Sequence, residues 1–423
     1  MAITASHRDA TRLRVGRLFD GTGADIVDDA ALLVIDGRIV DVGPNAAVAS
    51  PADARTIHHP DATAIPGLMD AHVHVVLPPT MDPLATLGAE SDDELVVRGA
   101  AAAERMVRAG VTTAYDCGAR GMTGYRVRDA IARGLSLGPR LLVSGRAITQ
   151  TGGHCHFFGG EADGIDGVRA AVRQMLETEG ADGIKIMATG GGLTPGTDSR
   201  HASYSVAELA AAADEAHRLG KRVTSHAHGV PGIRNASEAG IDSIQHCTML
   251  GMDWGWDFDE SVARGMVERG TRAVPTISAG TRAEIESGID INKLQPNPGA
   301  MTRADWFANA RRLIDAGVTV VPGTDVGVNL TDFGEELFFE LEAYVAIGLD
   351  PAAVIRMATE RAADHLGIGD ETGTLVAGKV ADVLVVGGRP DEDISALRGP
   401  VLVVRAGALI QPTPARPRPT PRT

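Results

Sequence analysis

The stretch Pro66-Gly67-Leu68-Met69-Asp70-Ala71-His72-Val73-His74 ends an apolar run with two histidines that are two residues apart. The run Ala64–Val75 predicts a buried strand, and side chains at positions i and i+2 of a strand point to the same face. His72 and His74 therefore face the same way, which is typical of a pair of metal-ligating imidazoles. Taken alone, the pair is explained equally well by two polar side chains that line a barrel and bind no metal.

Residues that can bind metals also stand at the ends of later apolar runs. Lys185 lies within Gly183–Ala188, where a buried cation is costly. A neutral lysine amine can react with carbon dioxide to give a carbamate that bridges two cations; pairing of this lysine with an acidic residue is the alternative. The other candidates at strand ends are His226, His228, His246 and Asp325. Such residues at successive strand ends are hard to produce by chance, so together they favour a metal site.

Short apolar runs alternate with Ala-rich helical segments through the middle of the chain. The predicted strands are Ala64–Val75, Val111–Gly118, Arg140–Gly145, Gly183–Ala188, Arg222–His228, Ser243–Cys247, Arg272–Ile277 and Val318–Asp325. The predicted helices between them include Ser91–Ala109, Asp166–Thr178, Ser205–Leu219, Gly232–Ala239 and Asp305–Ala316. Alternation implies a parallel sheet, and eight units imply an α/β fold of the (β/α)8 TIM barrel type over residues 63–369. Barrel enzymes hold their sites at the carboxyl ends of the strands, where the candidate ligands stand.

The two flanks of the barrel are rich in short strands. The predicted strands of the flanks are Leu13–Asp20, Ala31–Ile35, Arg38–Val42, Gly373–Leu375, Ala381–Val386 and Val401–Ala406. Asp36-Gly37 is a strong hairpin signal between two of them. We expect a small β-sandwich domain built from both termini, residues 1–62 and 370–410. Residues 411–423 contain five prolines and several arginines, which predicts a Pro-rich disordered tail.

Composition excludes several other classes of protein. The chain has 423 residues, of which 44% are hydrophobic, and a net charge of −15, so a nucleic-acid partner is not expected. No apolar run approaches the ~18 residues of a membrane helix, and the N-terminal residues do not resemble a signal peptide. Three scattered cysteines, Cys117, Cys155 and Cys247, argue against a disulfide framework and suit a reducing cytoplasm.

Several residues near the candidate site have both a functional and a structural interpretation. His228 shares a strand face with His226, so it either contacts the substrate or orients a ligand. Tyr204 either polarises a substrate carbonyl or packs the start of the next helix. The glycine-rich loop 151–160 carries His154 and His156, which could line the substrate pocket, and with Cys155 they could form a third metal site, although a structural role is favoured. Trp254 and Trp256 follow His246 and form either an apolar pocket wall or local loop packing.

These motifs, taken in order, resemble the amidohydrolase superfamily over nearly the whole chain. The resemblance is carried by His72-x-His74 after Pro66-Gly67, by the later ligand positions, and by the returning flank Gly373–Asp382. A closer likeness, to Xaa-Pro and Xaa-Arg dipeptidases, ochratoxinase-like amidases and aryl-urea or thiocarbamate hydrolases, is carried by Gly152-Gly153-His154, Lys185–Gly191 and His226-Ala227-His228.

The resemblance implies a binuclear metal centre. Two divalent ions are expected, zinc by default, with cobalt and manganese as alternatives. One ion would be held by His72, His74 and Asp325, and the second by His226 and His246. N-carboxylated Lys185 and a hydroxide would bridge the two ions, and Asp325 would take a proton from the water and return it to the leaving amine.

The sequence therefore predicts a metal-dependent hydrolase that cleaves an amide-like C–N bond in a small molecule. The bond could belong to a peptide, an N-acyl amino acid, an anilide, a urea or a carbamate. A deaminase or cyclic-amide hydrolase on the same scaffold is one alternative, and Lys185 argues against most deaminases. A non-catalytic scaffold protein is a second alternative, although such a protein should have lost some of the ligands. The sequence leaves open the particular substrate and whether the protein forms a homo-oligomer.

Overall fold

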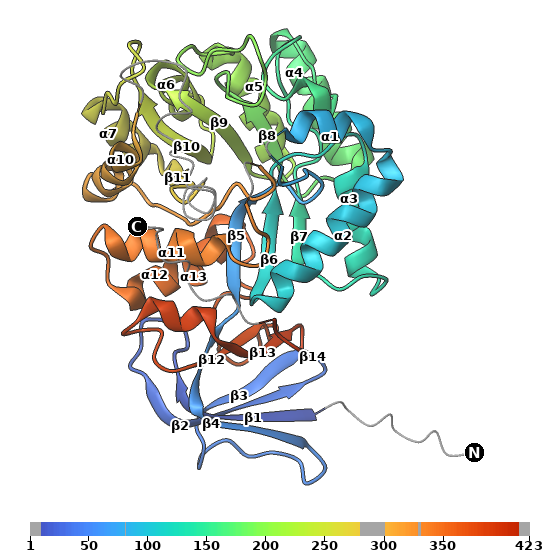
Figure 1. The fold of residues 1–423 in the computed structure, drawn as a ribbon, viewed down its shortest axis with the longest axis vertical. Helices are drawn as coiled ribbons and strands as arrows, with labels where there is room; N and C mark the ends of the chain where they lie inside the picture. Colours follow the sequence, from blue (N-terminus) through green and yellow to red (C-terminus); the bar gives the residue numbers. More distant parts are fainter. Residues whose placement is uncertain (1–9, 81, 280–300, 329–330, 414–423) are drawn as a thin grey trace, which may run out of the picture.

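The computed structural model describes residues 10–80, 82–279, 301–328 and 331–413. A barrel of strands surrounded by helices stands on a smaller β-domain, to which both ends of the chain contribute (Figure 1). Most of the predicted tail, residues 414–423, lies outside the described residues, as do residues 1–9.

The β-domain is a seven-stranded sheet with the order β14-β13-β12-β4-β1-β2-β3. Its strands are β1 Ala10–Leu18, β2 Val27–Ile35, β3 Arg38–Pro44, β4 Arg55–Pro66, β12 Val383–Gly387, β13 Pro400–Arg405 and β14 Ala408–Ile410. The predicted domain from both termini is confirmed, because β12 from the C-terminal flank pairs with β4 from the N-terminal flank. In the hairpin between β2 and β3, Asp36 and Gly37 both adopt positive φ, 50° and 78°, as a tight primed turn requires.

Three details of the predicted β-domain are corrected. The predicted strand Ala64–Val75 is broken at Gly67: residues up to Pro66 pair with β12, and the barrel strand begins at Leu68. The sheet thus extends beyond the predicted boundary at residue 62. A side chain at Gly67 would meet the Thr112 side chain at 2.2 Å, so the crossing between the two parts requires glycine. The predicted strand Gly373–Leu375 is a loop. The Leu375 N–H donates a single hydrogen bond to the carbonyl of Asp20, and the segment does not pair with a neighbouring strand.

The two faces of the β-domain sheet serve different cores. Leu13, Leu32 and Val383 pack within the domain, whereas the alternate residues Leu384 and Val386 belong to the large core of the barrel. Successive side chains of a strand point to opposite faces. The alternating side chains of β12 therefore both stabilise the small domain and attach it to the barrel.

Seven of the eight predicted barrel strands are regular. They are β5 Leu68–Val73, β6 Val111–Asp116, β7 Arg140–Val143, β8 Ile184–Met187, β9 Val223–Gly229, β10 Ser243–Leu250 and β11 Arg272–Val274. They form two parallel groups, β5-β6-β7 and β8-β9-β10-β11. The Ile148 N–H, which bonds to the Lys185 carbonyl at 2.8 Å, joins one group to the other.

The predicted eighth strand, Val318–Asp325, closes the barrel without forming a regular ladder. On one side the Val321 N–H bonds to the carbonyl of Ala273 at 2.9 Å, and on the other the Asp325 N–H bonds to the carbonyl of His72 at 2.8 Å. Further bonds run from the Ala273 N–H to the carbonyl of Thr319 at 3.0 Å and from the Ala71 N–H to the carbonyl of Pro322 at 3.2 Å. The pairing is interrupted because Pro322 has no N–H to donate and Asp325 has a φ of 59°. The barrel is therefore closed, as predicted.

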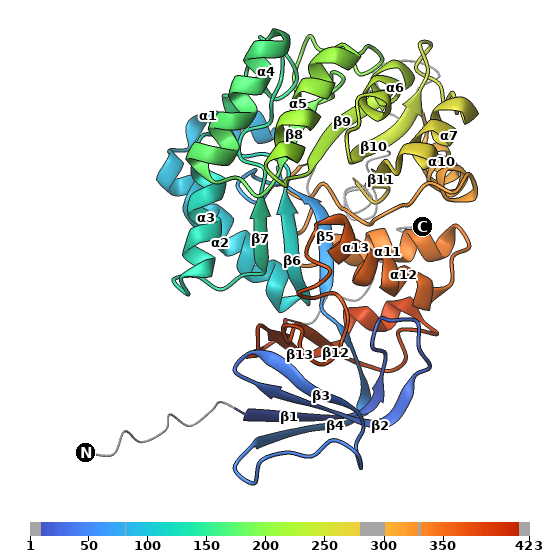
Figure 2. The ribbon, with the colours of Figure 1, turned by 180° about the vertical axis from the view of Figure 1, so that it is seen from behind.

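The helices cover the outside of the barrel (Figures 1 and 2). Their bounds are α1 Pro83–Ala89, α2 Asp92–Arg108, α3 Thr123–Ala132, α4 Gly164–Arg173, α5 Val206–Arg218, α6 Val230–Glu238, α7 Glu260–Arg269, α10 Arg303–Asp315, α11 Glu336–Ala346, α12 Pro351–Met357 and α13 Glu360–His365. Capping boxes at Ser91, Ser205 and Thr302 start α2, α5 and α10 by satisfying the first free N–H groups. A π-helical turn, Gln174–Glu179, extends α4, and two 3₁₀ turns lie at His156–Phe158 and Ile394–Arg398.

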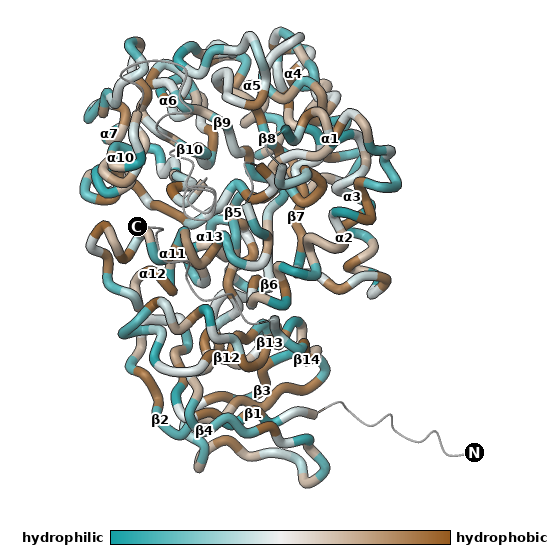
Figure 3. Tube along the Cα trace, in the orientation of Figure 1, coloured by the Kyte–Doolittle hydropathy of each residue, from teal (hydrophilic) through white to brown (hydrophobic). Residues whose placement is uncertain are grey.

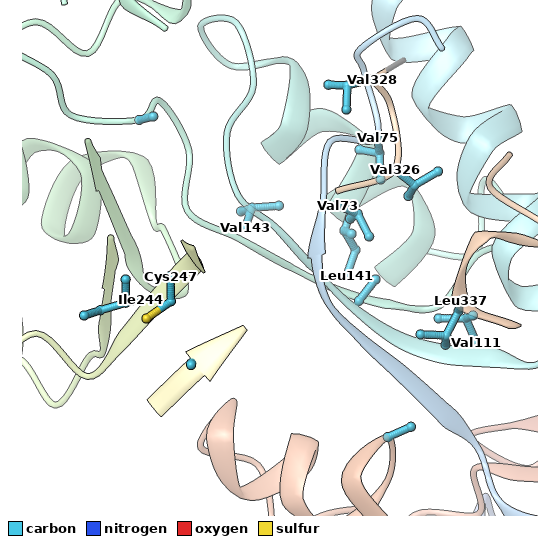
Figure 4. Packing of buried hydrophobic residues seen from close by; sticks show 14 of the residues in the cluster. Val73, Val75, Val111, Leu141, Val143, Ile244, Cys247, Val326, Val328 and Leu337 are labelled. Carbon is cyan, nitrogen blue, oxygen red and sulfur yellow. The ribbon is translucent and has the colours of Figure 1, made fainter. Parts of the chain in front are cut away.

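The core lies between the barrel strands and these helices. Hydrophobic residues recur along the strands and alternate with hydrophilic residues along the helices (Figure 3). Buried residues from both the strands and the helices form one large core. Figure 4 shows Val73 and Val75 beside Val326 and Val328, so the first strand and the segment after the eighth pack together at the mouth of the barrel. This packing fixes the two chain segments that carry the first candidate ligands and the last one.

Candidate metal centre

Three of the candidate ligands from the first and last barrel strands converge on one point. The Nε2 atoms of His72 and His74 are 3.3 Å apart, and the Asp325 Oδ1 atom lies 3.3 Å from the first and 3.4 Å from the second. Both histidines are buried, and the side chain of Asp325 is 18% exposed. The predicted common orientation of His72 and His74 is confirmed by this geometry.

A second group of donors lies beside the first. Ligand atoms of His226, His228 and His246 all lie within 4.8 Å of one another, and the three ring centroids are each 4.7 Å from the other two. His246 also falls within the same distance of His72 and Asp325, so it links the two groups. His228 was expected to contact substrate or to orient a ligand, and its position adds a third imidazole to this group.

Lys185 is the most deeply buried charged candidate, with 1% of its surface exposed. Burial lowers the pKa of its amine, against an opposing effect of Cys117 and Asp325. Among the residues that the structure describes, no carboxylate forms an ion pair with Lys185. The alternative of a lysine paired with an acidic residue thus has no support within this part of the chain.

Backbone carbonyls and one hydroxyl fix the orientation of the candidate ligand rings. The Nδ1 of His74 lies 2.9 Å from the carbonyl of Gly118, so the ring donates from Nδ1 and keeps the lone pair of Nε2 for the centre. The His226 Nε2 lies 3.0 Å from the carbonyl of Gly190, which leaves its Nδ1 for a ligand. The Nδ1 of His246 lies 2.9 Å from the Thr276 Oγ1 atom, so its Nε2 is the free nitrogen.

Burial keeps the imidazoles neutral. It lowers the pKa of His74 and of His228 to about 4, and the pKa values of His72, His226 and His246 well below the ordinary range. Because a metal binds the neutral imidazole, this environment removes the competition from protons near neutral pH.

Two candidate ligands occupy strained backbone positions. His246 and Asp325 have positive φ values of 65° and 59°, in the left-handed region that non-glycine residues rarely adopt. Such conformations cost on the order of 1–3 kcal/mol and persist where the surroundings enforce them, which is common at functional sites. Here they turn the side chains inward at the ends of their strands.

His154 lies against the second group of donors. Its ring centroid is 4.6 Å from that of His226, its Nδ1 is buried without a partner within the described residues, and its surface is 4% exposed. Gly191 permits this position, because a Cβ atom there would meet the Nε2 of His154 at 2.3 Å. His154 is therefore placed beside the centre, as a pocket residue would be.

The other residues predicted to contact the substrate have partners elsewhere in the structure. Tyr204 donates its hydroxyl to the carbonyl of Ala162 at 2.7 Å, which agrees with the packing interpretation. His156 is exposed, and its Nδ1 lies 3.1 Å from the carbonyl of Gly153. Trp254 is partly buried beneath the guanidinium of Arg200, at 4.4 Å from the ring centroid.

The donor groups found within the described residues include neither His156 nor Cys155. The possible third metal site in loop 151–160 thus has no geometric support there. Cys155 is buried, and its backbone N–H donates to Thr194 Oγ1, which agrees with a structural role.

Sequence reasoning missed the buried carboxylates that hold the ligand segments. Asp70 accepts hydrogen bonds from the backbone N–H groups of His72 and Thr324, each at 3.1 Å, and from the Thr324 hydroxyl at 2.7 Å. Asp116 accepts from the N–H groups of Val75 and Gly118, each at 3.0 Å. A carboxylate two residues before His72 in an apolar strand was the available signal for Asp70.

The donor set fits divalent metal ions. Nitrogen donors with free lone pairs and one carboxylate converge in a buried pocket, and backbone groups fix the ring orientations. A barrel with such a donor set at the carboxyl ends of its strands defines a class of metal-dependent hydrolases.

The chain belongs to the amidohydrolase family, whose model matches residues 63–410, and it is an enzyme that hydrolyses amide-like C–N bonds. The chain is 30% identical to an ochratoxinase of Aspergillus niger over 93% of this chain and 84% of the relative. It is similar to the crystal structure of a Xaa-Pro dipeptidase with bound methionine in the active site, with a TM-score of 0.84 and 31% identity over 95% of this chain and 99% of that one. A prolidase complexed with N-methylphosphonate-L-proline superimposes with a TM-score of 0.79 and 26% identity over 96% of this chain and 100% of that one.

Within the part of the chain that the structure describes, no helix is long and apolar enough to cross a membrane.

Proposed function

We propose that this enzyme hydrolyses the amide bond of a dipeptide or an N-acyl amino acid at a centre of two divalent cations. The observation that carries the proposal is the position of Lys185. It is buried among imidazoles, its amine pKa is lowered by burial, and it has no acidic ion-pair partner in the described residues. A neutral, buried amine is the form that reacts with carbon dioxide to give a carbamate, and a carbamate supplies the anion that a pair of cations needs between them.

Each cation would have its own ligands. His72, His74 and Asp325 would hold one cation, His226 and His246 the other, and N-carboxylated Lys185 would contribute to both. Zinc is the metal that a set of imidazoles with one carboxylate favours, and cobalt or manganese could replace it. When bound, such a pair of cations polarises a carbonyl group and makes water acidic enough to lose a proton near neutral pH.

The protein's own residues would handle the proton and the substrate. Asp325 Oδ2 would accept a proton from the attacking water and return it to the nitrogen of the leaving amine. His228 and His154, which are near His226, would donate hydrogen bonds to the substrate's carbonyl or carboxylate oxygen. Their depressed pKa values, about 4 and about 3 because of burial, mean that each would donate as a neutral ring. Tyr204, Trp254 and His156 would contribute at most to the outer wall of the pocket.

The substrate class rests on the relatives. A dipeptidase and prolidases are among the similar solved structures above 25% identity, so dipeptides are the first substrates to test. Molinate hydrolase and phenylurea hydrolase B, at 24% and 21% identity, support only the shared fold.

The experiment is a metal analysis combined with a substrate panel. The zinc-loaded enzyme should hold two equivalents of zinc and hydrolyse dipeptides or N-acyl amino acids faster than anilides, ureas or carbamates. Carbon-13 NMR after equilibration with labelled bicarbonate should show a carbamate signal that is absent from Lys185→Met. A protein that binds no zinc, or that cleaves no member of the panel, would overturn the proposal.

A cyclic amide is the second candidate substrate. The chain is 26% identical to an imidazolonepropionase of Symbiobacterium thermophilum over 86% of this chain and 85% of the relative. Ring opening of a cyclic amide by a sample that leaves dipeptides intact would favour this alternative, and release of ammonia from a heterocycle would favour a deaminase.

We also propose a cytoplasmic location. All three cysteines are buried and unpaired, which suits a reducing compartment. Assembly into a homo-oligomer is an open expectation that size measurements in solution would decide.

A further inference from the structure

Glu340 on α11 is a buried carboxylate outside the groups of candidate ligands. None of its surface is exposed, and its two oxygen atoms accept hydrogen bonds from backbone N–H groups, Ile277 at 3.2 Å and Ser278 at 2.6 Å. Within the described residues it forms no ion pair. A carboxylate so placed costs folding free energy unless its hydrogen bonds compensate, so its position calls for an explanation.

The backbone that Glu340 holds leads directly to a candidate ligand. Thr276, which precedes the two bonded N–H groups, has its Oγ1 atom 2.9 Å from the Nδ1 of His246. Thr276 adopts a φ of 51°, which is costly for a β-branched residue. On the other side of this turn, Arg303 donates to the carbonyls of Ile277 and Ala279, at 3.1 and 3.3 Å.

We propose that Glu340 is a positioning residue for His246, acting through the turn that presents the Thr276 hydroxyl. This inference rests on the metal centre of the proposed function. The two N–H bonds hold Thr276 in its strained conformation, and its hydroxyl accepts the Nδ1 proton of His246. The ring is thereby fixed in the tautomer that has its lone pair on Nε2. His246 is the residue that links the two donor groups, so a loss of its orientation would affect the second cation most.

The burial of Glu340 is consistent with this role. Burial raises its pKa to about 7, while the backbone N–H groups of Ser278 and Ile277 oppose the shift. The carboxylate is therefore kept in an unfavourable place by the same bonds that hold the turn.

The test compares variants along this path by their metal binding. Glu340→Gln and Glu340→Ala remove the paired acceptor, and Thr276→Val removes the hydroxyl while keeping the shape of the side chain. Each should bind the second equivalent of cobalt or zinc 10- to 100-fold more weakly in a chelator competition, while the first equivalent is retained. The visible spectrum of the cobalt protein should change accordingly. Thr276→Ser, which keeps the hydroxyl, should restore both the affinity and the spectrum.

Glu342→Gln is the matched control. Glu342 lies on the same helix with 10% of its side chain exposed, and it accepts a hydrogen bond from Arg398 at 2.5 Å. Its loss should lower the thermal stability and leave two equivalents of metal bound.

The outcomes separate this inference from the proposed function. If the wild-type protein binds two equivalents and folded Glu340→Gln and Thr276→Val bind them equally well, the inference is wrong and the proposed function stands. If the wild-type protein binds no metal, both are wrong. If Glu340→Ala does not fold, the result for Glu340→Gln, which keeps the size of the side chain, decides the matter.

Discussion

The Asp325 Oδ1 atom lies 3.3 Å from the Nε2 of His72, although the two residues come from opposite ends of the barrel sequence. The same two residues are joined through the backbone, since the Asp325 N–H donates to the carbonyl of His72 at 2.8 Å. The contact that closes the barrel therefore also assembles the first donor group.

Replacing Asp325 with Asn should affect the reaction more than the fold. The amide cannot take up the proton of the attacking water, so kcat should fall by about 10²–10⁴-fold. Metal content should be measured in parallel, because Asp325 is also a proposed ligand. Asp315→Asn on α10, where the carboxylate is 54% exposed and pairs with Arg311, should leave kcat unchanged. Full activity of metal-loaded Asp325→Asn would refute the assigned role.

Loosening the bonds between Asp70 and Thr324 should weaken both stability and metal binding. Both backbone N–H groups bond to Oδ1 of Asp70, so Asp70→Asn can keep these bonds, but it places an amide NH2 against the hydroxyl of Thr324 in a buried position, at a cost of about 1 kcal/mol. Thr324→Val removes the 2.7 Å bond from the hydroxyl to Asp70 and the 3.1 Å bond that the hydroxyl accepts from the Val326 N–H, and it should cost about 1–3 kcal/mol. Denaturant unfolding of the metal-free proteins would measure both, and equal midpoints for Asp70→Asn and the wild type would contradict the prediction.

Two adjacent glycines provide a matched test of His154. Gly191→Ala would place a Cβ atom 2.3 Å from the Nε2 of His154, whereas a Cβ atom at Gly192 meets nothing within 4 Å. Gly191→Ala should therefore displace the ring and raise KM by about tenfold, the effect of losing about 1.4 kcal/mol of binding. Gly192→Ala should behave as the wild type. Steady-state kinetics on the best substrate of the panel would decide, and identical KM values for the two variants would exclude a role of His154 in substrate binding.

The free energy of unfolding should depend on pH through His365. Burial, aided by Arg272 and Arg222, lowers its pKa to about 3 from 6.5. The stabilisation that comes from a neutral ring is therefore fully present above pH 6.5 and is lost as pH falls toward 3. At pH 5 the loss should be about 2 kcal/mol relative to pH 7.5.

His365→Gln, which does not titrate, is the reference for this effect. Between pH 7.5 and pH 5, the unfolding free energy of the wild type relative to that of the variant should fall by about 2 kcal/mol. A difference that stays constant over this range would show that His365 does not titrate as predicted.

Much of the candidate site could be predicted because the positions of its residues along strands carry the information. His72 and His74 share a strand face by the geometry of a strand alone, and the structure confirms it. Burial of Lys185 follows from its apolar neighbours. The roles assigned to these residues remain predictions until metal has been measured.

Other features depend on contacts between distant segments, which the local sequence does not encode. The need for glycine at position 67 arises from the close approach of Thr112, and the irregular eighth strand arises from Pro322 and the turned backbone of Asp325. Glu340 looks like an ordinary helix residue until the turn after β11 is seen to donate two N–H groups to it. The sequence leaves two interpretations of Tyr204. Its hydrogen bond to the carbonyl of Ala162, which only the structure shows, favours the packing interpretation.

The sequence by itself determined the family of folds and the types of donor atom, because the periodicity of apolar residues dictates which side chains are buried and which ends of strands carry polar groups. The tertiary structure alone decided which donors meet, which ring nitrogen is left free, and which buried carboxylates hold the ligand segments. Those relationships are set by hydrogen bonds across the closed barrel, between atoms whose separation along the chain says nothing about their distance in space.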